Sequence, residues 1–119
     1  MVMKIKAIRI KENGGPEKMN WEELEINAPS SGEVTIKHSF VGLNFIDTYH
    51  RSGLYPLPLP SGIGMEASGV VIDVGPEVTY VKLGDRVSYA MAIGSYSTHR
   101  KIEAAKLVKV PESISDSQA

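Results

Sequence analysis

Hydrophobic and polar residues alternate with a period of two along most of the chain, which is typical of β-strands with one buried face. The strands predicted from this alternation are residues 3–10, 33–41, 69–74, 86–90, 96–102 and 107–110. Alternation is most regular in residues 33–41, where the side chains predicted to share a face are Val34, Ile36, His38 and Phe40. The sequence therefore favours a mainly β fold.

Turn-forming residues separate these runs. The predicted turns are residues 13–16, 29–32, 75–76 and 83–85, and each of them contains glycine. Glycine permits positive φ and proline presets φ, so both residues favour turns for a physical reason. Short strands with frequent turns predict an all-β sandwich or barrel.

One stretch departs from the period of two and predicts a short helix near residues 45–52. The side chains spaced for one face of this helix are Phe45, Ile46 and Tyr49. Asn44 stands at the N-cap position with Asp47 three residues later, and Gly53 is suited to end the helix. Residues 54–60 contain three prolines, which predict an extended loop. A helical turn and a rigid loop inserted into a β scaffold often carry function.

Composition excludes several classes of protein. The 119 residues include 13 basic and 14 acidic side chains, and a formal charge of −1 gives no field that attracts nucleic acid or an anionic membrane. The absence of cysteine excludes disulfides, cysteine zinc ligands and a thiol nucleophile. No apolar run approaches the roughly 20 residues of a membrane span, and no signal region follows the N-terminus. We therefore expect a cytoplasmic protein of one domain.

Two candidate ligand motifs are better explained as ordinary structure. Residues 62–67 match G-x-G-x-x-A, but a phosphate-binding glycine loop needs a strand before it and a helix after it. Here a proline-rich loop precedes the motif and a valine-rich run follows, so we interpret it as a turn that leads into a strand. The three histidines, His38, His50 and His99, have no metal-ligand spacing, so no zinc site is predicted.

Residues 44–55 gather an asparagine, an aspartate, a histidine, an arginine and two tyrosines within twelve positions. Taken as residue types alone, these side chains allow a structural interpretation, in which Asn44 caps a turn, Tyr49 fills core and Arg51 is solvated. The alternative is a binding site. Both interpretations remain open from the residues themselves.

Several segments together carry a resemblance to a known family. They are residues 44–49 (Asn-Phe-Ile-Asp-Thr-Tyr), 51–56, 58–62, 64–71, Gly75, 84–87 (Gly-Asp-Arg-Val) and 96–97. With them the chain resembles the zinc-independent quinone oxidoreductases of the medium-chain dehydrogenase/reductase superfamily. The resemblance runs from the first strand to the last residue, and residues 44–55 are its most specific part.

The resemblance implies an architecture. Residues 1–111 are expected to form a GroES-like, partly open β-barrel, and residues 112–119 a linker towards a Rossmann domain that the chain lacks. In this family the active site lies in the cleft between the two domains, and the nucleotide glycines belong to the second domain. Most contacts to NADPH are therefore expected outside the present chain.

The resemblance also bears on zinc. Zinc-dependent relatives have a cysteine where this chain has Asn44 and a histidine where it has Met65, and many carry a four-cysteine lobe that this chain has no room for. An amide and a thioether do not replace thiolate and imidazole as zinc ligands. Without a Lewis acid, the chemistry should suit an acceptor that is already electrophilic, such as a quinone or a conjugated carbonyl.

Site residues follow from the resemblance one by one. Asn44 and Asp47 are expected to face the nicotinamide, since an amide both donates and accepts hydrogen bonds. Tyr49 and Tyr55 are expected to line the acceptor pocket as the catalytic pair, with rings that stack on a quinone and hydroxyls that donate to its oxygen. Glu66 has either a catalytic role or a purely structural one.

The predicted function is transfer of reducing equivalents from NADPH to a quinone without zinc, in a longer protein that is a homodimer. One alternative is a reductase of enones, enals or enoyl thioesters, with residues 54–60 shaping the choice of substrate. A second alternative is a non-catalytic GroES-like binding module. The isolated chain is expected to be inactive and to bind NADPH very weakly.

Overall fold

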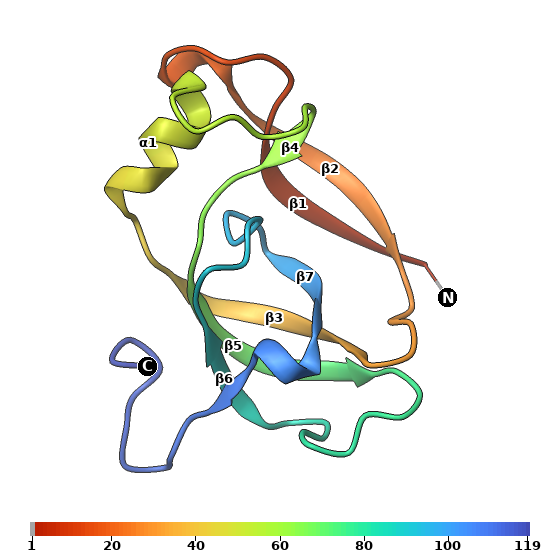
Figure 1. The fold of residues 1–119 in the computed structure, drawn as a ribbon. Helices are drawn as coiled ribbons and strands as arrows, with labels where there is room; N and C mark the ends of the chain where they lie inside the picture. The colour runs from red at the N-terminus through yellow and green to blue at the C-terminus, as the bar shows by residue number, and fades with distance from the viewer. Residues whose placement is uncertain (1) are drawn as a thin grey trace.

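The computed structural model describes residues 2–119 and confirms a mainly β fold with one short α-helix (Figure 1). The strands are β1 (Val2–Ile10), β2 (Met19–Asn27), β3 (Glu33–Val41), β4 (Ser61–Gly62), β5 (Ala67–Val74), β6 (Arg86–Tyr89), β7 (His99–Glu103) and β8 (Val108–Lys109). The helix is α1 (Phe45–Ser52), and the single 3-10 turns are η1 (Pro16–Lys18) and η2 (Ala104–Lys106).

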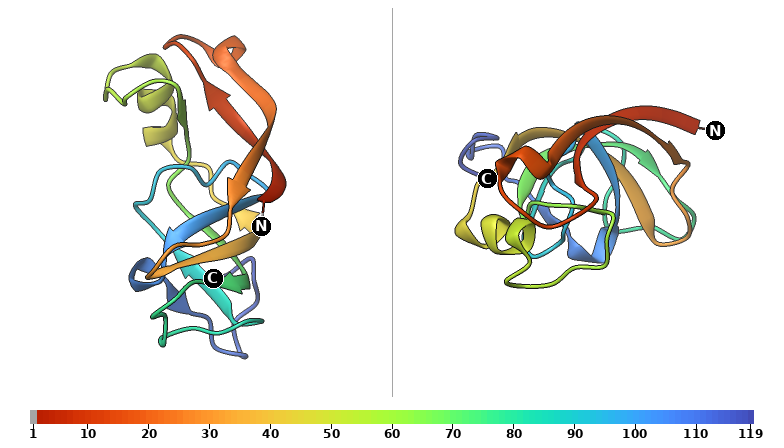
Figure 2. Two further views of the ribbon diagram at one scale, coloured as in Figure 1. Left: turned by 90° about the vertical axis from the view of Figure 1, so that its right-hand side faces the viewer. Right: turned by 90° about the horizontal axis from the view of Figure 1, so that it is seen from above.

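The strands form two antiparallel sheets. One has the order β2-β1-β4, and the other has the order β7-β3-β5-β6-β8. The sheets meet at a β-bridge between Ala7 and Ser97. Two hydrogen bonds of 2.8 Å flank this bridge: the Ile8 N–H donates to the Tyr96 carbonyl, and the Thr98 N–H donates to the Lys6 carbonyl. The sheets do not close into a cylinder, so the predicted partly open barrel is confirmed (Figure 2).

The hydrophobic core lies against the five-stranded sheet. Its buried side chains include Val34, Ile36, Val71, Val87, Ile102 and Leu107. Burying a side chain of this kind stabilises the fold by about 1.5–3 kcal/mol relative to leaving it exposed. The alternation of the sequence in β3 thus places its apolar residues where the other strands can cover them.

Strand β2 was missed by the sequence analysis. It pairs with β1 along its whole length, from Asn27 opposite Val2 to Met19 opposite Ile10. In this strand the half-buried Leu24 and Ile26 alternate with exposed neighbours. Three glutamates in nine residues make that alternation difficult to recognise from the sequence. Pairing with β1 therefore decides the conformation of this segment more than its own composition does.

The predicted strands 86–90, 96–102 and 107–110 are present with shifted or shorter bounds, and 69–74 begins two residues earlier. One side chain was placed wrongly: Phe40 does not share the buried face of Val34 and Ile36 but is 53% exposed. The pairing of β3 with β5 is irregular between His38 and Phe40. A β-bulge of this kind reverses the faces that follow it, so the period-two prediction fails beyond it.

The last residues fold back against the barrel. Arg86 donates from Nε to the Asp116 carboxylate at 2.7 Å, and its other nitrogens donate to the carbonyls of Pro111 and Ile114. Ser68, which is buried, donates to the Asp116 carbonyl at 2.7 Å. The segment of residues 111–119 is thereby fixed beside β5 and β6.

Candidate functional site

Helix α1 begins and ends as its sequence predicts. The Asn44 N–H donates to Asp47 Oδ2 at 3.1 Å, and the Asp47 N–H donates to the Asn44 carbonyl at 3.0 Å. At the other end Gly53 has φ +91°, a conformation that favours glycine, and its N–H donates to the Tyr49 carbonyl at 3.1 Å. The predicted N-cap and stop are both confirmed.

The predicted apolar face of α1 is wrong at Phe45, whereas Ile46 and Tyr49 are half-buried. Phe45 is 83% exposed, whereas the buried side chains of the helix are the polar residues Asp47 and His50. The helix is also joined to the turn after β1, where the Gly14 N–H donates to the Arg51 carbonyl and Arg51 Nε donates back to the Gly14 carbonyl. The barrel therefore covers the polar side of α1 and leaves Phe45 to solvent.

Asp47 is the most buried charged side chain of this region, with 3% of its surface exposed. Its Oδ2 accepts the Tyr96 hydroxyl at 2.6 Å as well as the Asn44 N–H. Burial in the first place, and the hydrogen bond to Asp47 in the second, raise the pKa of Tyr96 above its ordinary value of 10. Tyr96 thus remains a protonated donor to the carboxylate, a contact that the sequence analysis did not predict.

Three buried polar atoms of α1 have no hydrogen-bond partner among the described residues. They are Asn44 Nδ2, Asp47 Oδ1 and His50 Nδ1. Residues three apart on a helix lie on the same side, so these atoms belong to one side of α1. Buried polar groups in proteins are nearly always paired, and three exceptions together are typical of a site that receives a ligand or water.

The two predicted catalytic tyrosines lie together. The ring centroids of Tyr49 and Tyr55 are 5.3 Å apart with an interplanar angle of 70°, which is an edge-to-face contact. The Tyr55 N–H donates to the Tyr49 carbonyl at 3.2 Å, so the loop after Gly53 folds back on the helix. Half of the Tyr55 surface is exposed, and its ring is available to a planar partner.

The four predicted site residues therefore all belong to α1 and its flanks, as two linked pairs. Asn44 and Asp47 are joined at the start of the helix, and Tyr49 and Tyr55 are in contact at its end. Because Asp47 and Tyr49 are only two residues apart, their side chains point to different sides of the helix. The roles assigned to the four residues remain predictions.

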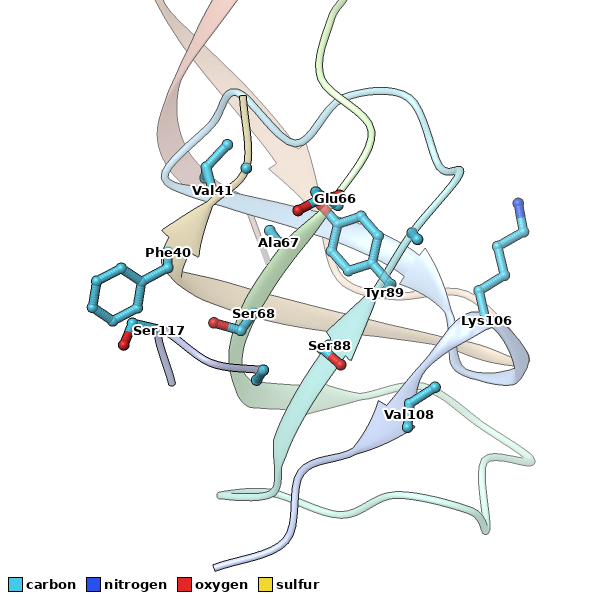
Figure 3. A pocket seen from close by; sticks show the side chains of 13 residues that line it. Phe40, Val41, Glu66, Ala67, Ser68, Ser88, Tyr89, Lys106, Val108 and Ser117 are labelled. Atoms are coloured by element: carbon cyan, nitrogen blue, oxygen red, sulfur yellow. The ribbon is translucent and has the colours of Figure 1, made fainter. Parts of the chain in front are cut away.

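Glu66 lies elsewhere, in a surface pocket of about 440 Å³ beside the end of the chain (Figure 3). Phe40 and Val41 of β3 line one side of this pocket and Tyr89 of β6 lines the other (Figure 3). A Cβ on Gly42 would stand 2.2 Å from Glu66 Oε1, so the glutamate side chain packs directly against the backbone of Gly42. This contact favours a structural role for Glu66.

A second pocket, of about 400 Å³, lies where the two sheets meet and is nearly all apolar. Its lining includes Ile8, Trp21, Val41, Leu43 and Tyr96. Trp21 is 56% exposed and Leu43 is 83% exposed, so this surface is open to solvent. Tyr96 therefore reaches from an open apolar groove to the buried carboxylate of Asp47.

A polar network crosses the five-stranded sheet. His38 contacts the Ser97 carbonyl through Nδ1 at 2.7 Å and the Tyr89 hydroxyl through Nε2 at 2.9 Å. Arg100 donates to the same hydroxyl at 3.4 Å and to the Ala92 carbonyl at 2.9 Å. Burial lowers the pKa of His38 from 6.5 to about 4. His38 is thus neutral, with Nδ1–H as donor and Nε2 as acceptor of the Tyr89 O–H.

Residues 2–119 contain neither a candidate metal site nor a candidate membrane-spanning helix. No group of three or more His, Cys, Asp or Glu side chains in that range is arranged to hold a metal ion. None of the helices in that range has the length and apolar character needed to cross a membrane. Residues 63–66 connect Gly62 of β4 to Ala67 of β5 without a helix, which confirms that the motif leads into a strand.

Comparison with known proteins gives a consistent set of relatives. The chain is 47% identical over 116 residues to a quinone oxidoreductase of Pseudomonas aeruginosa, an alignment that covers 96% of this chain and 36% of that protein. It is 40% identical over 116 residues to a 2-haloacrylate reductase of a Burkholderia species, with 92% and 34% covered. The chain thus spans about a third of the length of the curated relatives that it matches.

Solved structures agree with these relatives. The quinone oxidoreductase of Escherichia coli, determined in complex with NADPH, matches with a TM-score of 0.90 and 45% identity over 93% of this chain and 35% of that one. The alcohol dehydrogenase GroES-like domain family matches residues 30–112. With its open barrel, its short helix and this match over more than half of its length, the chain belongs to the alcohol dehydrogenase GroES-like domain family.

Proposed function

We propose that this chain is the barrel part of an NADPH-dependent oxidoreductase that reduces a quinone without zinc, with its site on α1. The observation that carries the proposal is the set of unpartnered polar atoms on α1 next to the paired tyrosines Tyr49 and Tyr55. The similarity to quinone oxidoreductases over 96% of the chain supports the same activity. Residues 112–119 would connect the barrel to the nucleotide-binding part, and the whole protein would be a homodimer.

The residues at the start of α1 fit the nicotinamide end of NADPH. Asn44 Nδ2 is an unused donor, and Asp47 Oδ1 is an unused acceptor. A carboxamide and a ribose hydroxyl each both donate and accept hydrogen bonds, so either would satisfy this pair. Both atoms are covered in the chain by itself, so we expect local movement at the Asn44 side chain when the nucleotide binds.

The tyrosines fit the acceptor. A quinone is flat and carries two carbonyl oxygens, so the exposed face of Tyr55 would pack against its ring and a phenol O–H would donate to an oxygen. NADPH, when bound, supplies the reducing equivalents that, with one further proton, convert the quinone to a hydroquinone. Tyr49 would hold Tyr55 in place through the edge-to-face contact.

The donor chemistry of the site supports a reaction without zinc. Asn44 offers an amide and Met65 a thioether, and the chain contains no cysteine. Zinc sites in proteins are built from thiolate, imidazole and carboxylate ligands. An acceptor that needs no Lewis acid, such as a quinone, suits this set of residues.

A graft would test the proposal. Residues 1–119 would replace the matching third of the Escherichia coli quinone oxidoreductase, and quinone-dependent oxidation of NADPH would be measured. We expect Tyr55→Phe and Asn44→Ala each to lower kcat/KM by about tenfold or more, which is the effect of losing one hydrogen bond to a reacting group. Tyr80→Phe is the matched control, because Tyr80 is as exposed as Tyr55 and its ring contacts the Lys109 ammonium of β8. Full activity in both site variants would overturn the assignment.

A second candidate is reduction of a conjugated acid or carbonyl, which the similarity to a 2-haloacrylate reductase supports. A panel of quinones, enones and 2-haloacrylate assayed on the same graft would separate the two candidates. A folded graft that binds NADPH but reduces none of these acceptors would instead support a binding module.

A further inference from the structure

Tyr96 has no role in the proposed function so far, although its hydroxyl makes a short hydrogen bond to one of the site residues. Its hydroxyl donates to Asp47 Oδ2 at 2.6 Å across 49 positions of sequence. Asp47 Oδ2 also receives the Asn44 N–H, so both bonds reach the same oxygen and Oδ1 receives none. Two donors on one oxygen fix the rotation of a carboxylate, and here they leave Oδ1 as the free acceptor.

The position of Tyr96 is itself determined by a glycine. Gly64 has φ +96°, and a Cβ built on it would stand 2.4 Å from Tyr96 Cδ1 and 2.2 Å from Ser95 Oγ. The Tyr96 N–H donates to the Ile63 carbonyl at 3.0 Å, so the backbone beside Gly64 also holds the tyrosine. The second glycine of the 62–67 motif thus makes room for the ring that reaches Asp47.

We infer that Tyr96, seated on Gly64, is a positioning residue that orients the Asp47 carboxylate so that Oδ1 is presented to the nucleotide. This inference rests on the proposed function, because it assigns Asp47 a contact with NADPH. Tyr96 touches neither nucleotide nor acceptor in this arrangement and acts only through Asp47. Its hydroxyl is the part that matters, while its ring serves the packing against Gly64 and the groove with Trp21.

The grafted enzyme tests this inference through Tyr96→Phe, which keeps the ring and removes the hydroxyl. We expect kcat to fall by about tenfold while the KM for quinone changes less than about twofold, because the acceptor pocket is untouched. In an Asp47→Asn background the same substitution should change kcat by less than about twofold, since the carboxylate that it orients is gone. Tyr80→Phe serves as the control and should leave kcat unchanged.

A spectroscopic measurement on the 119-residue chain gives an independent readout. The Asn44 N–H shares Oδ2 with the Tyr96 hydroxyl, so its resonance in a ¹H–¹⁵N spectrum should shift in Tyr96→Phe and stay in place in Tyr80→Phe. The far-ultraviolet circular dichroism should be unchanged in both variants. Gly64→Ala, which displaces the ring, should shift the same resonance.

The outcomes separate the inference from the proposed function. An active graft in which Tyr96→Phe equals Tyr80→Phe, or in which its effect persists in full beside Asp47→Asn, overturns the inference alone. A folded graft that binds NADPH and reduces no acceptor overturns the proposed function, and the inference with it. An unshifted Asn44 resonance in Tyr96→Phe also overturns the inference, whatever the activity.

Discussion

Acidification below pH 6.5 should destabilise this fold through His38. His38 of β3 is half-buried, and its ring is held neutral between the Ser97 carbonyl and the Tyr89 hydroxyl of β6. Burial is the main cause of its low pKa, and the positive charge of Arg100 acts in the same direction, followed by His99. Protonating the ring would remove the acceptor that Tyr89 uses and place a second cation beside Arg100.

The sign of the effect follows from the two pKa values. Above pH 6.5 the ring is neutral in the folded and in the unfolded chain, so the full stability is present. As the pH falls from 6.5 towards 4, His38 binds a proton in the unfolded chain but not in the folded chain, and the free energy of unfolding decreases. The difference between the pKa of about 4 and the ordinary value of 6.5 corresponds to a loss of about 3 kcal/mol by pH 4. Such a loss is a large part of the stability of a small domain.

The measurement compares urea unfolding of the parent chain and of His38→Gln between pH 7.5 and pH 4. Glutamine can donate and accept as the neutral imidazole does, but it does not titrate. All other ionisable groups are common to both proteins, including His99, whose pKa is also lowered by burial. The difference between the two free energies of unfolding therefore isolates His38.

We expect the variant to be the less stable protein at pH 7.5 and to lose less stability on acidification, so that the difference changes by about 3 kcal/mol. Most of the change should occur between pH 6 and pH 4.5, as a consequence of the window that the two pKa values set. Parallel curves for the two proteins across this range would refute the reasoning, because they would mean that His38 titrates alike in the folded and unfolded chains.

Two further predictions concern the frame of the barrel. Gly75→Ala should lower the free energy of unfolding by more than about 2 kcal/mol, since its Cβ would stand 2.1 Å from the Ser30 carbonyl oxygen and backbone would have to move. Urea unfolding checks this prediction. Gly32→Ala is the control, because it meets no atom but carries the backbone strain of φ +81°, and a loss at Gly75 no larger than the loss at Gly32 would contradict the prediction. Arg86→Met should speed amide hydrogen exchange in residues 111–119 while leaving the strands protected, because it removes the hydrogen-bond donors to that segment. Unchanged exchange in residues 111–119 would contradict this prediction, because it would show that other contacts hold the segment.

Local chemistry made part of this structure predictable from sequence. Strand β3 has the predicted bounds because its apolar residues alternate and a glycine-containing turn precedes it. The ends of α1 were predictable for the same reason: Asn44 and Gly53 act through bonds to residues within four positions. Caps and turns depend on neighbours along the chain, so a sequence contains nearly all that determines them.

Non-local contacts explain what the sequence did not reveal. β2 is a strand because β1 pairs with it, although its glutamates disguise the pattern. Phe40 is exposed because of an irregular pairing with β5, a feature of two strands and not of one. Tyr96 contacts Asp47 because the two sheets meet at Ser97, and no spacing in the sequence predicts a contact of that kind.

The polar side of α1 links the fold to the proposed function. A helix of eight residues is not stable by itself in water, so α1 depends on its caps, on the bonds between Arg51 and Gly14, and on Tyr96. A side built only for stability would be apolar, because each buried polar atom without a partner costs about 1–3 kcal/mol. The chain instead places Asn44, Asp47 and His50 there and leaves one atom of each unpaired. Proteins often depart from the rules of stable packing at their functional sites. We therefore expect a ligand to form its first hydrogen bond with the unpaired Oδ1 of Asp47.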